Sequence, residues 1–152
     1  MKISTQRDID APPDTLFSDM ADLDRHLNDA ADRGIEIIRL DDGSQGIAGG
    51  SWRVDFSLAG RRRTGELRVA KWAPNGQMAL AGTVDGLAVA IDLEVAPLQD
   101  DRSRLAVAVD IAPTSMGGRI LVQTLKLARP QIETRMESRI DRIQGRAEAR
   151  AV

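Results

Sequence analysis

The sequence predicts an α+β protein in which a curved antiparallel sheet wraps around a long C-terminal helix. Between residues 51 and 112, several segments alternate apolar and polar residues with a period of two, which is typical of strands with one buried face. Short turn sequences join these segments, whereas parallel pairing would need connections of about a dozen residues or more. Between Gly117 and Glu148 the apolar residues recur at the spacing of a single helical stripe.

The N-terminal segment predicts one strand followed by two short helices. Residues 2–9 alternate weakly and are expected to form the strand. The segment 12–20 begins with two prolines, which suit the first turn of a helix because a backbone N–H there has no helical partner. A second helix is expected on Leu23 and Leu27, ending at Gly34.

The central part of the chain predicts most of the sheet. Residues 35–43 are expected to form a strand that closes on a turn. After a glycine-rich loop, strands are expected in quick succession at residues 51–58, 64–72, 77–84, 86–98 and 103–112. The turn sequences between them read AGR, PNG, VDG and QDDRS. With the first strand they predict an antiparallel sheet of six to seven strands.

The C-terminal third predicts one long amphipathic helix over residues 117–148. Its apolar stripe, spaced by three and four residues, is Leu121, Leu125, Ala128, Ile132, Met136, Ile140, Ile143 and Ala147. Thr114 or Ser115 is the expected N-cap. Pro130 is expected to kink the helix because it removes one internal hydrogen bond. At ~1.5 Å per residue the helix would span roughly 45–50 Å, so it is the element long enough to cover the sheet.

Charges are unevenly distributed along the chain and around this helix. Residues 1–42 carry 11 acidic and 5 basic residues, whereas residues 116–152 carry 8 basic and 4 acidic ones. Either the two ends lie near each other in the fold, or these charges serve only solubility. The helical stripe is flanked on one side by Glu133, Glu137 and Asp141, and on the other by Arg135, Arg139, Arg142 and Arg146. Two interpretations of these rows stay open: each row is a solvated edge of the helix, or partners from elsewhere in the chain offset the repulsion between like charges four residues apart.

Length and composition favour one domain. A chain of 152 residues is typical of a single domain, expected here at residues 1–148 with a frayed tail at 149–152. The absence of cysteine excludes disulfides, cysteine-ligated zinc, iron–sulfur clusters and thiol nucleophiles, and one histidine makes no ordinary zinc or haem site, so we expect neither metal nor cofactor. The sequence shows no signal peptide and no spanning segment, and its net charge of −2 gives no electrostatic case for nucleic acid, so a cytoplasmic protein is expected.

Two segments connect this order of elements with a known superfamily. DIDAPPDTLFSDMADLDRH runs from a strand through prolines into a short helix, and MGGRILVQTLKLARPQIETRMESRIDRI supplies the long helix. The chain resembles the START-like superfamily of helix-grip proteins over residues 1–148. That superfamily includes polyketide cyclases, lipid-transfer domains, pollen allergens and a group associated with carbon-monoxide dehydrogenase. The shared motifs are patterns of apolar spacing, so they imply the fold more than the chemistry.

The resemblance implies an apolar cavity between the curved sheet and the long helix, where some members bind lipids, hormones or polyketides. Carried over, the implied lining is Trp52, Val54, Phe56, Leu58, Leu67, Val69, Met78, Leu80, Val84, Val89, Ile91, Leu93, Val107, Val109, Leu121, Leu125, Ala128 and Ile132. Only 3% of the residues are aromatic, so medium-sized side chains either fill this space or leave part of it open for a guest. The sequence leaves both alternatives open.

Few residues are suited to catalysis. The acidic residues of the strands fall on the outward face, so no buried carboxylate pair is expected. His26 is the one group whose ordinary pKa suits proton transfer near neutral pH, although a structural role is the simpler interpretation. Arg7 and Arg39 could point inward and meet a ligand carboxylate, or pair with a local acid. These three residues are the weak catalytic candidates.

These observations favour a protein that binds a small hydrophobic or amphipathic ligand, for transport or sequestration, and does not transform it. Two alternatives stay open. One is a polyketide cyclase or dehydratase type of enzyme, with His26 and Arg7 or Arg39 as candidate groups. The other is an assembly or interaction protein similar to the group associated with carbon-monoxide dehydrogenase.

Three surface features complete the interpretation. The outward alanines Ala79, Ala81, Ala88, Ala90, Ala106 and Ala108 are expected to form a mildly apolar patch that could serve as a homodimer face. GRRRTG at residues 60–65 is a basic hairpin tip, either a solvated turn or a contact for phosphates or anionic lipid. The glycines of SMGGR at residues 115–119 suit either anion binding at a helix start or close packing of that helix on the sheet.

Overall fold

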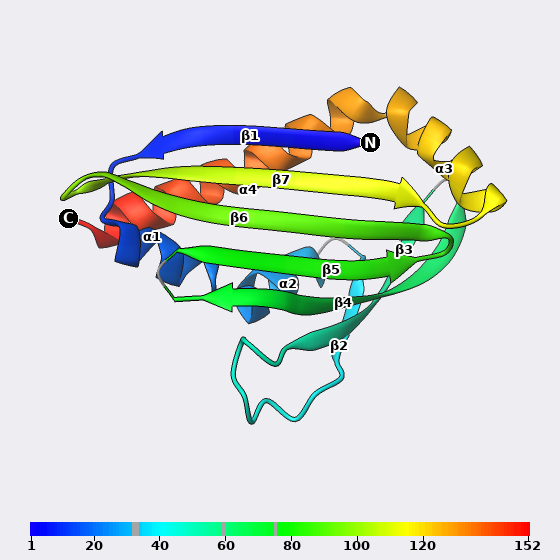
Figure 1. Cartoon of the computed structure of the whole chain (residues 1–152), viewed down its shortest axis with the longest axis horizontal. Coiled ribbons are helices and arrows are strands. Elements are labelled where there is room, and N and C mark those ends of the chain that lie inside the picture. Colours follow the sequence, from blue (N-terminus) through cyan, green and yellow to red (C-terminus); the bar gives the residue numbers. More distant parts are fainter. Residues whose placement is uncertain (32–33, 59, 75) are drawn as a thin grey trace.

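The computed structural model describes residues 1–31, 34–58, 60–74 and 76–152. Its strands are β1 (Lys2–Ile9), β2 (Glu36–Arg39), β3 (Ser51–Leu58), β4 (Arg61–Ala73), β5 (Gln77–Val84), β6 (Leu87–Gln99) and β7 (Arg102–Pro113). Its helices are α1 (Pro13–Met20), α2 (Leu23–Ala31), α3 (Met116–Leu127) and α4 (Arg129–Arg150). This order confirms the predicted elements except at the C-terminal helix (Figure 1).

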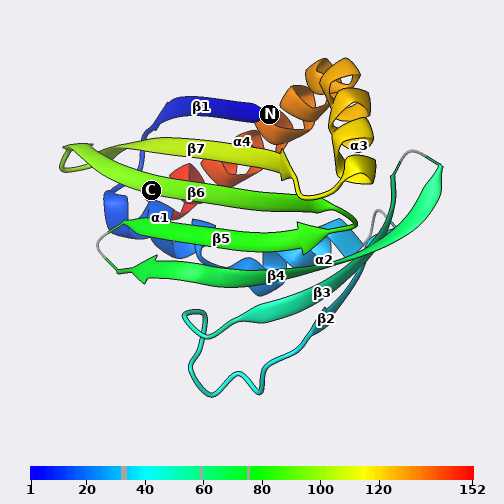
Figure 2. The same ribbon diagram turned by 45° about the vertical axis from the view of Figure 1, so that its right-hand side comes forward.

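The strands form one antiparallel sheet in the order β1-β7-β6-β5-β4-β3-β2, with seven strands. Strands β2 to β7 are a meander, and β1 closes the far edge by pairing with β7. The two ribbon views place α1, α2 and α4 on one face of the sheet and α3 across one of its ends (Figures 1 and 2). We call the face covered by the helices the inner face and the opposite face the outer face. The arrangement confirms the predicted α+β helix-grip fold.

One strand differs from its expected bounds in a way that shapes the sheet. β4 begins at Arg61, three residues before the predicted start. Its pairing with β5 shifts register between Val69 and Lys71. A bulge of this kind bends a strand and increases its twist, which helps a sheet to curve around the elements it covers.

Several predicted turns fall partly outside the described residues. Ala59 of the AGR turn, Asn75 of the PNG turn and residues 32–33 before Gly34 all lie there. The described glycine next to each gap, at positions 34, 60 and 76, has a positive φ of 85°, 76° and 122° respectively. Glycine adopts such angles without steric cost, as the turn predictions require.

The single helix predicted over residues 117–148 is wrong, because the structure divides it in two. α3 ends at Leu127, and α4 starts at Arg129 after Ala128, whose φ and ψ of −93° and 9° are not helical. Pro130 lies in the first turn of α4. A proline inside a helix loses a hydrogen bond and clashes with the carbonyl four residues earlier, so the chain ends one helix and begins another where a kink was expected. α4 then continues to Arg150.

Two clusters of buried apolar side chains hold the helices to the inner face. The first cluster joins α1 and the C-terminal half of α4 to one end of the sheet, and its members include Leu16, Phe17, Met20, Trp52, Met78, Leu80, Val95, Leu105, Val107, Ile140, Ile143 and Ala147. The second cluster joins α3 to the other end through Leu87, Leu121, Val122 and Leu125. Each such side chain contributes about 1.5–3 kcal/mol when it is fully buried.

Ion pairs confirm that the acidic N-terminal segment lies against the basic C-terminal one. Asp19 of α1 lies 3.4 Å from Arg146 and 3.8 Å from Arg150, both in α4. Asp29 of α2 lies 3.5 Å from Arg139 of the same helix. On the opposite side of α4, Glu137 and Asp141 pair with Arg7 of β1. Two members of each row of like charge on α4, Glu137 with Asp141 and Arg139 with Arg146, therefore receive partners from elsewhere in the chain.

The start of α3 packs tightly on the turn between β5 and β6. Ser115 is the N-cap, as predicted, and its Oγ accepts a hydrogen bond from the Gly118 N–H at 3.0 Å. A Cβ atom added to Gly118 would lie only 1.9 Å from the carbonyl oxygen of Gly86. Close packing therefore accounts for Gly118.

Candidate ligand-binding site

Between the two buried clusters, the inner face carries apolar side chains that are not fully covered. Val54 and Phe56 of β3, Val84 of β5, Val89 of β6 and Val109 of β7 are half-buried, and they belong to neither cluster. We call these five residues the inner band. Their positions alternate with outward-facing residues, so their side chains point toward the helices.

The helices do not cover the inner band completely. β5, β6 and β7 are internal strands with neighbours on both sides, so Val84 and Val109 gain no accessibility from a sheet edge, whereas Val89 also borders a hollow on the outer face. Gly65 and Gly82 occupy inward positions beside them and add no side chain to fill the gap. Side chains in close-packed interiors are normally fully buried, so the partial exposure of these valines shows that the packing over this part of the sheet is incomplete.

One charged residue borders the inner band. Arg63 pairs in register with Phe56 and points inward, with its side chain 11% exposed. Its Nε donates a hydrogen bond to the Leu58 carbonyl at 3.0 Å, and its Nη1 lies 3.5 Å from Asp85. The interpretation of GRRRTG as a hairpin tip, either a solvated turn or a contact for phosphates or anionic lipid, did not predict this inward position of Arg63. Because Leu67 faces inward and side chains alternate along a strand, Gly65 and Arg63 also take inward positions, so the same pattern assigns Arg63 to the inner face.

His26 faces α1 and α4 and already has a partner at each ring nitrogen. With Nε2 protonated, it donates to the Asp19 backbone carbonyl at 3.0 Å, and Nδ1 accepts from Arg146 at 3.4 Å. Burial is the main reason that the pKa of His26 lies below its ordinary value. The hydrogen bond to Asp19 raises this pKa and the nearby Arg146 charge lowers it. The side chain is a neutral connector between helices, which matches the structural role weighed for it.

Stability should therefore depend on pH through His26. Because the pKa is lower in the folded state than in the unfolded state, where it is about 6.5, the unfolded chain binds more protons as the pH falls. The contribution is complete above pH ~6.5 and is lost as the pH falls through the folded-state pKa. Urea titrations of the native protein and of His26→Gln give the free energy of unfolding of each at several pH values. We expect the difference, native minus variant, to become smaller as the pH falls from 7.5 to 5. A flat difference would contradict this assignment.

The other two catalytic candidates are engaged in ion pairs. Arg7 points inward from β1 and bonds Glu137 and Asp141 of α4, with Gln144 accepting a further hydrogen bond at 3.3 Å. Arg39 donates from Nε to Asp41 at 3.0 Å and from Nη2 to a loop carbonyl. It also lies 5.5 Å from the ring centre of Trp52, within the range of a cation–π contact. Neither guanidinium lies free at the inner band.

A buried charge cluster that sequence reasoning did not find lies at the crossing of α1, α2 and α4. The Asp19 side chain is fully buried, and Arg25 lies 2.7 Å from its Oδ1. Arg146 and Arg150 approach the same oxygen, so three guanidinium groups surround one carboxylate. Asp19 falls on the buried face of α1, two residues after Phe17, and only the acidic surplus of the N-terminal segment hinted at such a contact. The cluster fixes the helices that bound the inner band.

The predicted lining residues occupy the positions that alternation assigned to them. Trp52, Met78, Leu80 and Val107 are buried in the first cluster, and Leu67, Val69, Ile91 and Leu93 pack against it. Leu121 and Leu125 are buried in the second cluster, where Leu58 and Ile132 pack against them. Ala128 lies at the break between α3 and α4. The remaining five residues are the inner band, which belongs to neither cluster.

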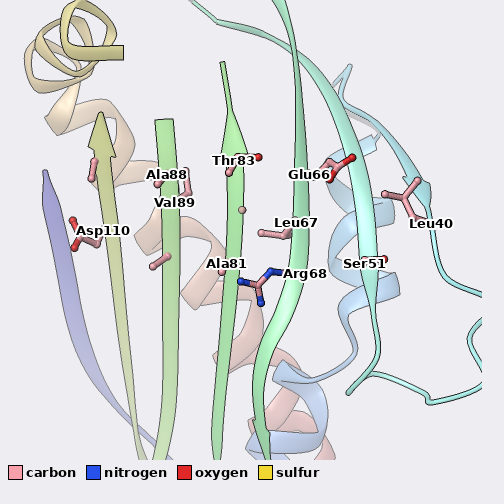
Figure 3. Close-up of a pocket in the computed structure, with 13 residues that line it drawn as sticks. Leu40, Ser51, Glu66, Leu67, Arg68, Ala81, Thr83, Ala88, Val89 and Asp110 are labelled. Carbon is pink, nitrogen blue, oxygen red and sulfur yellow. The ribbon is translucent and has the colours of Figure 1, made fainter. Parts of the chain in front are cut away.

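The outer face is hollowed where the alanines were expected to form a flat patch. A shallow cavity of about 620 Å³ is lined by Leu40, Ser51, Glu66, Leu67, Arg68, Ala81, Gly82, Thr83, Ala88, Val89, Ala90, Asp110 and Ala112. Figure 3 shows Arg68 of β4 reaching toward β5, with Asp110 on the far side of the hollow. Cross-strand register places Arg68, Ala81, Ala90 and Asp110 in one row. The small side chains therefore lie in the middle and the charges at the sides.

Acid–base, nucleophilic and metal-binding groups are sparse around these sites. Within residues 1–31, 34–58, 60–74 and 76–152, no group of three or more histidine or acidic residues is placed to hold a metal ion. The described inward positions next to the inner band are apolar apart from Arg63, whose guanidinium is an anion-binding group. The arrangement places one guanidinium beside a set of apolar side chains.

The chain is similar to known proteins in its three-dimensional structure. No family model and no curated protein matches the sequence. The crystal structure of Zhui aromatase/cyclase from Streptomyces sp. R1128 has 16% identity and a TM-score of 0.72, covering 100% of this chain and 96% of that one. Norcoclaurine synthase from Thalictrum flavum, in complex with dopamine and hydroxybenzaldehyde, has 13% identity and a TM-score of 0.67, and the match covers 95% of this chain and 84% of that one.

A third solved structure extends the comparison. The START superfamily protein from Mycobacterium smegmatis has 19% identity and a TM-score of 0.56, covering 90% of this chain and 97% of that one. At such identities the likeness concerns the arrangement of the backbone. Together with the antiparallel sheet and its helices on one face, these neighbours confirm the expected resemblance: the chain has the START-like helix-grip fold.

Proposed function

We propose that this protein binds a small apolar or amphipathic molecule between the inner face of the sheet and the helices, and carries or sequesters it unchanged. The observation that supports this most is the half-buried state of the inner band, Val54, Phe56, Val84, Val89 and Val109. A guest that covered these side chains would remove apolar surface from water, which favours binding by about 25 cal/mol per Å². Norcoclaurine synthase, a neighbour in fold, has been crystallised with two small aromatic molecules.

An amphipathic guest fits better than a purely apolar one. Arg63 lies at the end of the inner band, with little exposure and one carboxylate partner, Asp85, at 3.5 Å. A polar end group of the ligand beside this guanidinium would gain a charge-assisted hydrogen bond.

Binding without chemical change is favoured over the cyclase or dehydratase alternative. Such an enzyme needs a group that exchanges protons within reach of the substrate. His26 uses both ring nitrogens in contacts with Asp19 and Arg146, and Arg7 and Arg39 are held by carboxylates. None of the three candidates is aimed at the inner band.

A pair of matched variants on β7 tests whether the band borders open space. Val109→Phe should cost less than about 1 kcal/mol of unfolding free energy, because the larger side chain enters accessible space. Val107→Phe, two residues away on the same face, should cost about 1–3 kcal/mol because Val107 is buried in the first cluster. Val109→Phe should also weaken binding of the amphipathic dye 1-anilinonaphthalene-8-sulfonate by tenfold or more, measured by fluorescence. Equal destabilisation by both variants would mean that the band is filled core.

A second candidate function is self-association through the outer face. A two-fold axis parallel to the strands, midway between Ala81 and Ala90, would place Arg68 of one copy opposite Asp110 of the other. The same operation puts Ala81 opposite Ala90, so the small side chains of the two hollows face each other and opposite charges lie beside them. This self-complementary row favours a homodimer over a contact with an unrelated protein.

Charge reversal tests the homodimer. Arg68→Asp and Asp110→Arg should each abolish dimers in analytical ultracentrifugation, because each variant places like charges in apposition. Mixing the two variants should restore a dimer, because each reversed residue then meets its opposite. Arg142→Asp on α4, on the other side of the sheet, is the matched control and should leave the dimer unchanged. A native protein that sediments as a monomer at ~100 μM would overturn this candidate.

A further inference from the structure

α3 carries apolar side chains on two opposite sides. Leu121 and Leu125 face the sheet in the second cluster. Met116, Ile120 and Leu127 are 73%, 70% and 85% exposed. At ~100° per residue these three lie along one stripe of the helix, on the side away from the sheet. We call them the outer stripe of α3. Isolated exposed apolar residues need no explanation, but an aligned set on one helix marks an interaction surface.

The chain around the outer stripe is basic. Residues 111–132 contain three basic residues and no acidic one. Arg119 and Lys126 fall within this segment and lie beside the outer stripe on the helix. A surface that combines long apolar side chains with cations and lacks acids is typical of helices that lie in the headgroup region of a membrane.

The tip of the β3–β4 hairpin adds further positive charge at the same end of the molecule. Leu58, just before the tip, packs against the second cluster, to which α3 contributes Leu121, Val122 and Leu125. Figures 1 and 2 both show the hairpin and α3 at this end. Arg61 and Arg62 are exposed there. The GRRRTG segment, which the sequence left as either a solvated turn or an anionic contact, therefore lies beside an exposed apolar helix.

Acidic residues at this end neutralise only part of the charge. Asp85 lies 3.5 Å from Arg63, and Glu36 lies 3.7 Å from Arg62. Among the residues that the structure describes, Arg61, Arg119 and Lys126 have no carboxylate within ion-pair distance. Three cations are thus left to meet an external anion.

We propose that α3 and the β3–β4 hairpin tip form a docking surface for a bilayer that contains anionic lipids. The outer stripe inserts at the boundary between headgroups and acyl chains, and Arg61, Arg119 and Lys126 contact the lipid phosphates. No helix among the described residues is long and apolar enough to cross a membrane, so the contact is peripheral. Ligand binding at the inner band is not required for it.

A second copy of the chain is the less suitable occupant. α3 carries Arg119 and Lys126 and no acidic residue, so two α3 helices packed stripe to stripe would bring cations together in either relative direction. Like charges in contact oppose association. A lipid surface offers negative charge and an apolar interior together.

Vesicle flotation tests the proposal directly. The purified full chain is mixed with vesicles of phosphatidylcholine alone or with 30 mol% phosphatidylglycerol, at 50 and 500 mM NaCl. We expect binding to the anionic vesicles at 50 mM NaCl, and at least tenfold weaker binding to phosphatidylcholine alone or in 500 mM NaCl. Two double variants should each weaken binding to the anionic vesicles tenfold or more: Ile120→Ser/Leu127→Ser and Arg119→Gln/Lys126→Gln.

Matched controls separate this surface from general stickiness. Ile38→Ser changes a similarly apolar side chain on β2 that is 47% exposed, and Arg135→Gln/Arg142→Gln removes two exposed arginines of α4. Both should bind like the native protein. Native protein that fails to float with anionic vesicles would overturn the proposal. An Ile120→Ser/Leu127→Ser variant that floats normally would also overturn the proposal. If that variant in addition loses self-association, the outer stripe is a contact between copies of the chain. Because no guest enters the assay, failure here leaves the ligand proposal standing.

Discussion

Asp19→Asn should destabilise the protein by about 3 kcal/mol, measured as the free energy of unfolding in urea. Its carboxylate is fully buried, and Arg25, Arg146 and Arg150 all approach one of its oxygens. Removing one partner of a buried ion pair costs about 3–5 kcal/mol because the charge left behind is uncompensated. The lower end of that range applies because the three arginines are partly exposed and can turn toward water.

Asp14→Asn is the control for this substitution. Asp14 lies in the first turn of the same helix and is exposed. There a negative charge contributes only about 0.3–1 kcal/mol through the helix dipole. Equal effects of Asp14→Asn and Asp19→Asn would contradict a structural role for the buried cluster.

Gly118→Ala should cost about 3 kcal/mol, although alanine is normally the better helix former. The added Cβ would lie 1.9 Å from the Gly86 carbonyl oxygen, which belongs to backbone and cannot rotate away. Either α3 or the β5–β6 turn must shift, and overpacking of this kind costs about 1–3 kcal/mol or more. The second cluster should loosen with it, because α3 supplies Leu121, Val122 and Leu125 to that cluster.

The neighbouring glycine provides the control. A Cβ on Gly117 would meet only the Ser115 Oγ, at an ordinary 3.9 Å. Gly117→Ala should therefore stabilise the protein by about 0.4–1 kcal/mol, since alanine restricts the unfolded chain and favours the helix. Thermal unfolding of both variants measures the contrast. Stabilisation by Gly118→Ala would show that α3 does not pack on the β5–β6 turn.

Much of the fold follows from local pattern, because alternation and helical spacing are properties of contiguous residues. β3 and β5 have the bounds that their alternation predicts, and Ser115 caps α3 as its residue type suggests. The C-terminal helix was less predictable. Its apolar stripe continues across Pro130, and periodicity does not tell whether a proline bends a helix or ends it.

The candidate site could be predicted only in part. Alternation placed Val89, Val107 and Val109 on the inner face, yet Val107 is buried and the other two are half-buried. That difference depends on which distant segments pack on each side chain, which no local pattern records. The same limit hid Arg63, whose inward position follows from its register with Phe56. It also hid Asp19, whose three arginine partners come from α2 and from the distant α4.

Native mass spectrometry of the protein purified from its own host tests the ligand proposal most directly. We expect a one-to-one complex with a small apolar or amphipathic molecule, released on denaturation and recovered in the organic extract. The Val109→Phe variant, purified in the same way, should carry little or none of it, whereas Arg142→Gln should carry as much as the native protein. A native protein that has only its own mass, or a Val109→Phe variant that is as fully occupied as the native protein, would contradict a ligand site at the inner band.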